Sequence, residues 1–168
     1  MISSPDSLKL IQLFEDLRLK AYLDIFGVPT IGWGHTNNVK LGMTCTKEQA
    51  DKWLYDEIHS FEVQVLKALN ADEIEINQHQ FDALVCFAYN LGTYTLVHGN
   101  KTAPITKVGK LWQALKSKQV NLVVANFMLY TNKGVRGLWI RRKAESMLFE
   151  GKNIDEIIKW VRQEQAKK

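Results

Sequence analysis

Two carboxylates and a threonine lie close together near the N-terminus, in the segment FEDLRLKAYLDIFGVPTIGWGHT (14–36). They are Glu15, Asp24 and Thr30. A glycosidic bond can be hydrolysed between two such carboxyl groups: a protonated one donates to the leaving oxygen, and an ionised one activates water or stabilises the developing oxocarbenium ion. Glu15 has apolar residues nearby on both sides, so partial desolvation would favour its neutral form. It is the candidate acid.

Asp24 falls in a more polar, glycine-containing stretch and is the candidate ionised carboxylate. Thr30 follows on a later strand, where a free hydroxyl could help to hold a water near Asp24. The alternative is that Glu15 and Asp24 are ordinary solvated surface charges. The spacing alone does not choose between these two interpretations.

Other catalytic chemistries are disfavoured by the rest of the sequence. The potential soft metal ligands are dispersed along the chain: His35, His59, His79, His98, Cys45 and Cys86. They include no histidine pair with the HExxH spacing, and there is no nucleophile elbow, P-loop or dinucleotide fingerprint. We therefore expect neither a metal nor a cofactor. Two cysteines are also too few for a disulfide framework, and we expect both to be free.

The elements that must position the carboxylates can be outlined from local signals. Ser4 and Pro5 form a helix start, and the helix that follows would deliver Glu15 at its C-terminal end. From Arg18 to Thr36 the helical period disappears and turn residues punctuate alternating positions, which predicts a small antiparallel sheet. A capping box at Thr46 and Gln49 opens a long helix reaching about residue 69.

Helical patterns dominate the remainder of the chain. Asn77, with Gln80 three residues on, starts a strongly apolar helix that Gly92 ends. The further expected segments are a loop over 92–104 and helices over about 105–117, 120–131, 138–150 and 154–165, the last capped by Asn153 with Glu156. A small sheet followed by a helical region predicts the α+β class.

The first segment carries a resemblance to a known family. The pattern E-x-x-R-L-K-A-Y-x-D-x-x-G-x-x-T-I-G-x-G-H-T, from Glu15 to Thr36, resembles the N-terminal signature of the phage-type lysozymes of glycoside hydrolase family 24. FDALVCFAYNLG (81–92) is similar to the family's buried helix, and GLWIRRKAESMLF (137–149) to its Arg-rich late helix. The resemblance implies a single lysozyme-like domain over 1–168. Its lobes would cover roughly 15–70 and 77–168, with helix 5–15 packing on the second lobe.

The resemblance also implies roles for individual residues. Glu15 would be the general acid, Asp24 the carboxylate that acts with water, and Thr30 the residue that orients this water. Four further residues fall where the family braces or lines its saccharide groove: His35, Thr36, Tyr89 and Asn90. Gly32 and Gly34 would permit close backbone packing beside the cleft. The chain departs from the family pattern at Asp16, where glycine is common, and in the loop 93–104, which leaves groove residues there unassigned.

The charge distribution is uneven. Residues 1–100 carry 7 basic and 13 acidic residues, a net −6, whereas residues 101–168 carry 15 and 5, a net +10. A basic half suggests a polyanionic partner. The resemblance makes that partner peptidoglycan rather than nucleic acid. The helix over 154–165 bears Trp160 and several bases; either it simply closes the helical lobe, or it also engages lipopolysaccharide or anionic lipid.

Three functions follow as alternatives. The first is an endolysin, a monomeric muramidase that hydrolyses the β-1,4 bond between N-acetylmuramic acid and N-acetylglucosamine, with inversion. The second is a lytic transglycosylase, which needs a single acid; Asp24 and Thr30 favour the water-using reaction. The third is a non-catalytic wall- or nucleic-acid-binding module. The start MISSPDSLKL lacks a signal-like apolar run, so we expect the protein in the host cytoplasm until holin-type release, then in the periplasm at the cell wall.

Overall fold

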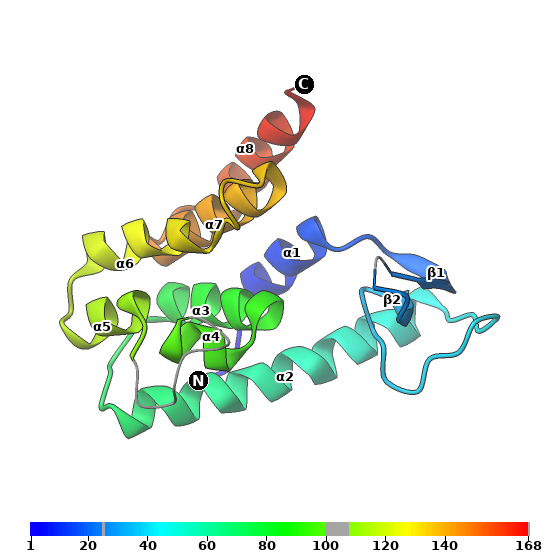
Figure 1. Cartoon of the computed structure of the whole chain (residues 1–168), viewed down its shortest axis with the longest axis horizontal. Helices are drawn as coiled ribbons and strands as arrows, with labels where there is room; N and C mark the ends of the chain where they lie inside the picture. Colours follow the sequence, from blue (N-terminus) through cyan, green and yellow to red (C-terminus); the bar gives the residue numbers. More distant parts are fainter. Residues whose placement is uncertain (25, 100–107, 168) are drawn as a thin grey trace.

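The computed structural model describes residues 1–24, 26–99 and 108–167. It is mainly helical with a small two-stranded antiparallel sheet, which confirms the α+β class. The elements are α1 (Pro5–Phe14), β1 (Arg18–Leu23), β2 (Pro29–Gly32), α2 (Lys47–Ala71), α3 (Gln78–Leu91), α4 (Thr93–His98), α5 (Lys110–Lys116), α6 (Val120–Phe127), the 3-10 turn η1 (Met128–Tyr130), α7 (Arg136–Phe149) and α8 (Ile154–Ala166). Figure 1 shows α2 running from the hairpin at one end to the helices at the other. In the described part of the chain no helix is both long and apolar enough to cross a membrane.

The helix starts follow the local capping chemistry. Ser4 accepts a hydrogen bond from the Asp6 N–H, with Pro5 in the first turn of α1. Thr46 and Asn77 each form a complete capping box at the start of α2 and α3. Asn153 caps α8 by accepting from the Asp155 N–H. These starts were predicted correctly, because a cap satisfies orphan N–H groups within three residues of itself.

Three predicted segments differ from the structure. Residues 93–98, expected in a loop, form the short helix α4, whereas residues 100–104 of that loop lie outside the described residues. The helix expected from about 105 begins at Lys110; positions 105–107 are not described and 108–109 are not helical. The helix expected to reach 131 ends at Phe127 and continues as η1.

The apolar interior is divided unequally between two clusters. The larger one joins all eight α-helices, α1 to α8, of the described residues, with Phe81, Phe87 and Trp112 fully buried. The smaller one, beside the hairpin, consists of Ala21, Ile31 and Val39 with Cys45 and Trp53 packed against it. The hairpin region therefore depends on the N-terminal half of α2 for most of its burial.

Gly32 allows β2 to pack closely against α2. Its φ is +67°, and a Cβ built there would lie 3.0 Å from the Cβ of Ala50 on α2. The predicted close backbone packing at Gly32 is thus present, and a side chain at this position would push β2 away from α2.

The first helix belongs to the other part of the molecule. It packs on α3, α7 and α8 (Figure 1), so the helix that ends at Glu15 is held by the helical region.

Asp72, at the C-terminal end of α2, connects this helix to α5. Its carboxylate accepts hydrogen bonds of 2.7 Å from Lys116 Nζ and from the indole Nε1 of the fully buried Trp112. Both hydrogen bonds lower the pKa of Asp72 below its usual value, and the one from Lys116 has the larger effect. A lowered carboxyl pKa contributes stability that is present above the unfolded pKa of about 3.9 and is lost as pH falls through the folded value.

We expect Asp72→Ala to lower the free energy of unfolding by about 1–3 kcal/mol at pH 7, because the Trp112 N–H is left without its acceptor. The variant should also lose less stability than the wild type between pH 5 and pH 3, since one depressed carboxyl has been removed. Denaturant unfolding at both pH values measures this. Asp56→Ala, which breaks an exposed ion pair with Lys52 on the same helix, is the matched control and should cost less than about 1 kcal/mol.

Candidate active site

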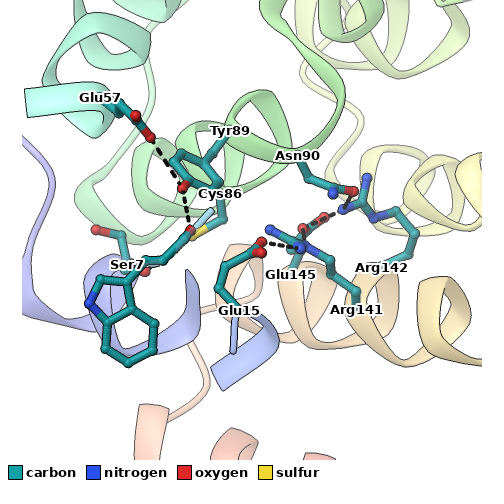
Figure 2. A network of polar contacts seen from close by, with 10 residues as sticks. Ser7, Glu15, Glu57, Cys86, Tyr89, Asn90, Arg141, Arg142 and Glu145 are labelled. Atoms are coloured by element: carbon teal, nitrogen blue, oxygen red, sulfur yellow. Dashed lines mark hydrogen bonds and ion pairs between the residues drawn. The ribbon is translucent and has the colours of Figure 1, made fainter. Parts of the chain in front are cut away.

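Glu15 ends α1. It is the C-cap residue, and its N–H donates to the Ile11 carbonyl. The backbone changes from helical to extended at this residue. The side chain is partly buried, and its Oε1 accepts a 2.8 Å hydrogen bond from Arg141 Nη1 of α7 (Figure 2). The sequence predicted apolar surroundings for this carboxyl group. The structure instead adds a guanidinium from a residue far away in the sequence.

Glu15 opens into a cavity of about 380 Å³ between the hairpin region and the helical region. Its described lining consists of Glu15, Trp33, Gly34, Thr36, Glu57, Phe61, Tyr89 and Asn90. The structure therefore brings together four of the seven predicted site residues, which come from three separate segments. The mixture of aromatic rings, an amide, a hydroxyl and carboxylates is one that can both stack against and hydrogen-bond a polar ligand such as a sugar.

Gly34 borders the Glu15 carboxyl group directly. A Cβ built at Gly34, whose φ is +101°, would lie 3.8 Å from Oε2 of Glu15. This is ordinary contact distance, so a side chain there would fill the space in front of that oxygen. The Glu15 carboxyl thus has one oxygen engaged by Arg141 and the other facing bare backbone.

Asp24 occupies the turn between β1 and β2. Its Oδ1 accepts 2.8 Å hydrogen bonds from the N–H groups of Phe26 and Val28, and its backbone pairs with Val28 and Gly27. This is the Asx-type turn that aspartate favours. The carboxylate therefore holds the hairpin together through one oxygen, which leaves Oδ2 without a backbone partner among the described contacts.

Thr30 pairs with Tyr22 across the sheet and is 4% exposed. Its hydroxyl donates to the Val28 carbonyl at 2.9 Å. The expectation of a free hydroxyl at Thr30 is wrong, because the tight hairpin turn places the Val28 carbonyl within reach. Of the residues that the structure describes, those lining the Glu15 cavity include neither Asp24 nor Thr30. Both stay predicted catalytic residues on the hairpin.

His35 lies in the turn after β2 and is held on two sides. Its Nδ1 is 2.6 Å from Oε1 of Glu57, and its ring stacks on Trp53 with centroids 4.7 Å apart and an interplanar angle of 13°. It lines a neighbouring cavity of about 530 Å³, which shares Glu57 with the Glu15 cavity. His35 connects the turn to α2, as a bracing residue does; a role in substrate binding remains a prediction.

Tyr89 and Asn90 form the α3 side of the cavity. The Tyr89 hydroxyl donates to the Trp33 carbonyl at 3.2 Å and lies 3.5 Å from Oε2 of Glu57 (Figure 2). Burial raises the pKa of Tyr89 far above its usual value, and the carboxylates of Glu57 and Glu15 raise it further. The phenol therefore stays neutral and serves as a donor. Asn90 Oδ1 accepts a 2.9 Å hydrogen bond from Arg142.

Two further residues at the site, Glu57 and Arg141, carry recognisable signals in the sequence. Glu57 falls on the apolar stripe of α2, where a carboxylate is out of place unless it has a partner. Arg141 stands in a helix that buries both Ile140 and Ala144. A charge at a buried helical position requires a countercharge, but the identity of that countercharge depends on the tertiary fold.

The molecule consists of a small sheet region, a long connecting helix and a helical region, with the Glu15 carboxyl group in the cavity between them. This arrangement defines the lysozyme type of fold. The family model described as phage lysozyme matches residues 12–145. The chain belongs to the phage lysozyme family, and with that membership it is a peptidoglycan-hydrolysing enzyme of the muramidase type.

Individual relatives agree with this assignment. The chain is 34% identical over 155 residues to an endolysin of Acyrthosiphon pisum secondary endosymbiont phage 1, covering 88% of this chain and 97% of the relative. It is also 34% identical to an endolysin of Bacillus phage PZA, of which it spans only 54%. Among solved structures, the endolysin from Escherichia coli O157:H7 phage FAHEc1 superposes with a TM-score of 0.72 at 30% identity, covering 89% of this chain and 93% of that one.

Proposed function

We propose that this protein is an endolysin that hydrolyses the β-1,4 bond between N-acetylmuramic acid and N-acetylglucosamine of peptidoglycan, with inversion. Glu15 is the general acid, Asp24 is the carboxylate that acts with water, and Thr30 orients that water. The observation that carries the proposal is the Glu15 carboxyl group, which faces a cavity between the two regions with one oxygen held and one open. The enzyme acts at the cell wall after release from the producing cell.

The hydrogen bonds support an assignment of atoms to each step of this proposal. Because Oε1 of Glu15 already accepts from Arg141, the transferable proton resides on Oε2, beside Gly34. A glycosidic oxygen in the cavity can approach there without meeting a side chain. On proton donation Glu15 becomes an anion, and the Arg141 guanidinium stabilises that anion as the bond breaks.

On the hairpin, Oδ1 of Asp24 is occupied by two N–H groups, so Oδ2 is the oxygen that accepts a proton from water. The Thr30 hydroxyl hydrogen is donated to Val28, so its oxygen can only accept a hydrogen bond from that same water. A water held by both residues would present its lone pair toward the sugar ring. Attack on the face opposite to the leaving group inverts the anomeric carbon.

Digestion of purified peptidoglycan tests the proposal. Inverting hydrolysis of a β-1,4 bond releases a reducing end that is initially the α-anomer, observable by NMR before mutarotation. Mass spectrometry of the same products distinguishes the alternatives: a 1,6-anhydro end would identify a lytic transglycosylase, and the absence of any released fragment would identify a binding module. A β-anomer as first product would contradict inversion but not hydrolysis.

A separate proposal concerns the basic C-terminal region. Trp139 and Trp160 lie with ring centroids 6.0 Å apart, and Trp139 is partly exposed. Ile154, Ile157 and Val161 of α8 are buried in the larger cluster, so the apolar face of α8 serves the fold and is not available to a membrane. Contact with lipopolysaccharide or anionic lipid must therefore use the exposed cations beside the two tryptophans.

We expect Lys159→Glu/Arg162→Glu to weaken binding to anionic vesicles and lipopolysaccharide at least about tenfold, since each reversal replaces an attraction of roughly 1 kcal/mol per base by repulsion. Activity on purified peptidoglycan should stay unchanged. Lys40→Glu/Lys67→Glu makes the same charge change at exposed sites near and on α2 and is the control. Equal binding of both double variants to the vesicles and to lipopolysaccharide would contradict the proposal. Removal of residues 153–168 is unsuitable because it would also remove buried core.

A further inference from the structure

Three charged residues of α7 form a cluster inside the larger core. Glu145 is 1% exposed and Arg142 is fully buried, and Arg141 is also buried. Oε1 of Glu145 lies 2.6 Å from Nη2 of Arg142 and 3.5 Å from Nε of Arg141. The residues are three and four positions apart, so one face of the helix brings them together. We call Arg141, Arg142 and Glu145 the α7 charge cluster.

The two arginines of this cluster reach the same cavity by different routes. Arg141 donates to Glu15, and Arg142 donates to Asn90. Figure 2 shows Glu145 beside both arginines, with Arg141 reaching Glu15 and Arg142 reaching Asn90. Glu145 is not among the described lining residues of the cavity, yet it is hydrogen-bonded to Arg142 and ion-paired with Arg141, the two residues that hold lining groups in place.

Burying the α7 charge cluster carries a large desolvation cost relative to the stability that it can provide. Burial raises the pKa of Glu145 and lowers the pKa of Arg142, although attraction between them acts in the opposite direction on both. Several of its atoms are buried without a hydrogen-bond partner: Arg141 Nε and Nη2, Arg142 Nε and Nη1, and Glu145 Oε2. Apolar residues of the same volume often stabilise a core equally well. The arrangement is better explained by its contacts with the site.

We propose that Glu145 is a positioning residue for the hydrolysis. It fixes Arg141 against Glu15 and Arg142 against Asn90, and its negative charge offsets one of the two guanidinium charges so that Glu15 can carry the proton it must donate. This inference rests on the proposed role of Glu15 as the acid. The α7 charge cluster has a net charge of +1 when Glu145 is ionised. Without the Glu145 charge the net charge is +2, and the added positive potential favours the Glu15 anion, which cannot donate.

Other groups near the cluster and near Glu15 do not perform this balancing. On α3, burial raises the pKa of the Cys86 thiol well above its usual value, so it stays neutral, and Asp82 is bonded to Ser4 at the start of α1. Around Glu15, Tyr89 is neutral and Glu57 is paired with His35. Asp16, next to Glu15 in the chain, is exposed. Glu145 is the buried carboxylate that contacts both guanidinium groups.

Three variants place different net charges on the cluster. Glu145→Gln gives +2, Glu145→Gln/Arg142→Gln restores the wild-type +1, and Arg142→Gln gives 0. We measure kcat/KM on soluble peptidoglycan fragments as a function of pH. The fall of kcat/KM on the alkaline side of this profile, its alkaline limb, reports loss of the proton from the free enzyme's acid. The limb should move down by roughly one pH unit in Glu145→Gln, return in the double variant, and move up in Arg142→Gln.

A purely structural role would give a different result. Leu148→Ala, a buried change on the same helix, should lower stability without moving the limb, and circular dichroism and thermal unfolding check each fold. If Glu145→Gln alone does not fold, the double variant, expected to keep the wild-type limb, and Arg142→Gln, expected to raise it, still test the charge order. A wild-type limb in folded Glu145→Gln or in folded Arg142→Gln overturns this inference while leaving the function intact. Full activity of Glu15→Gln would instead overturn the function on which it rests.

Discussion

Glu15→Gln is expected to lower turnover on purified peptidoglycan by about 10²–10⁴-fold or more while the protein stays folded, because general acid catalysis contributes roughly that much. Glutamine has nearly the same volume, and its carbonyl oxygen can still accept the hydrogen bond from Arg141. The change removes the proton beside Gly34 and little else. Release of soluble muropeptides from purified walls measures it, and thermal unfolding reports the fold.

Glu150→Gln is the matched control. It makes the same carboxyl-to-amide change at an exposed site just after α7 and should keep wild-type turnover. Wild-type substrate binding by Glu15→Gln, with turnover lost, would place the defect in the chemical step rather than in the groove. A Glu15→Gln protein that clears cell walls at a substantial fraction of the wild-type rate would refute the assignment of Glu15 as the acid.

Asp24→Asn is expected to lower turnover by a similar factor of about 10²–10⁴, because an amide cannot take a proton from water. The variant should fold normally. The asparagine carbonyl oxygen can accept from the N–H groups of Phe26 and Val28 as Oδ1 of Asp24 does, so the hairpin turn keeps its hydrogen bonds. Turnover on purified walls and the thermal unfolding midpoint are the two measurements.

Asp24→Ala separates the two tasks of this side chain. It removes the acceptor of both turn N–H groups as well as the charge, so it should lower both turnover and the stability of the hairpin, the latter by about 0.5–1.5 kcal/mol per lost hydrogen bond. If Asp24→Asn is fully active and Asp24→Ala is not, then Asp24 has a structural task only. Retained activity with 1,6-anhydro products would favour the transglycosylase alternative, which needs no activated water.

Local chemistry made the helix starts and the position of Glu15 at the end of α1 predictable. Ser4 with Pro5 and the capping boxes at Thr46 and Asn77 are complete within three or four residues, so the sequence contains both partners of each bond. The end of α1 at Glu15 is local in the same sense, because the Glu15 N–H donates to the carbonyl of Ile11, four residues earlier. The helix α4 was missed because Thr93–His98 is short and rich in β-branched residues. It is helical since Thr95 and Leu96 are buried against the core, which outweighs its weak propensity.

The sequence by itself determined the end of the first helix at Glu15 and the hairpin that carries Asp24, because each is encoded in a continuous segment. The lysozyme class followed from a resemblance over three segments, whereas the catalytic roles of Glu15 and Asp24 stay predictions. The tertiary structure alone decided what surrounds them. Arg141 meets Glu15 across 126 positions, and Glu57 meets His35 across 22. It also decided that the Thr30 hydroxyl is engaged by Val28. Electrostatic and hydrogen-bonding partners of this kind depend on which helix faces pack together, and that information is spread over the whole chain.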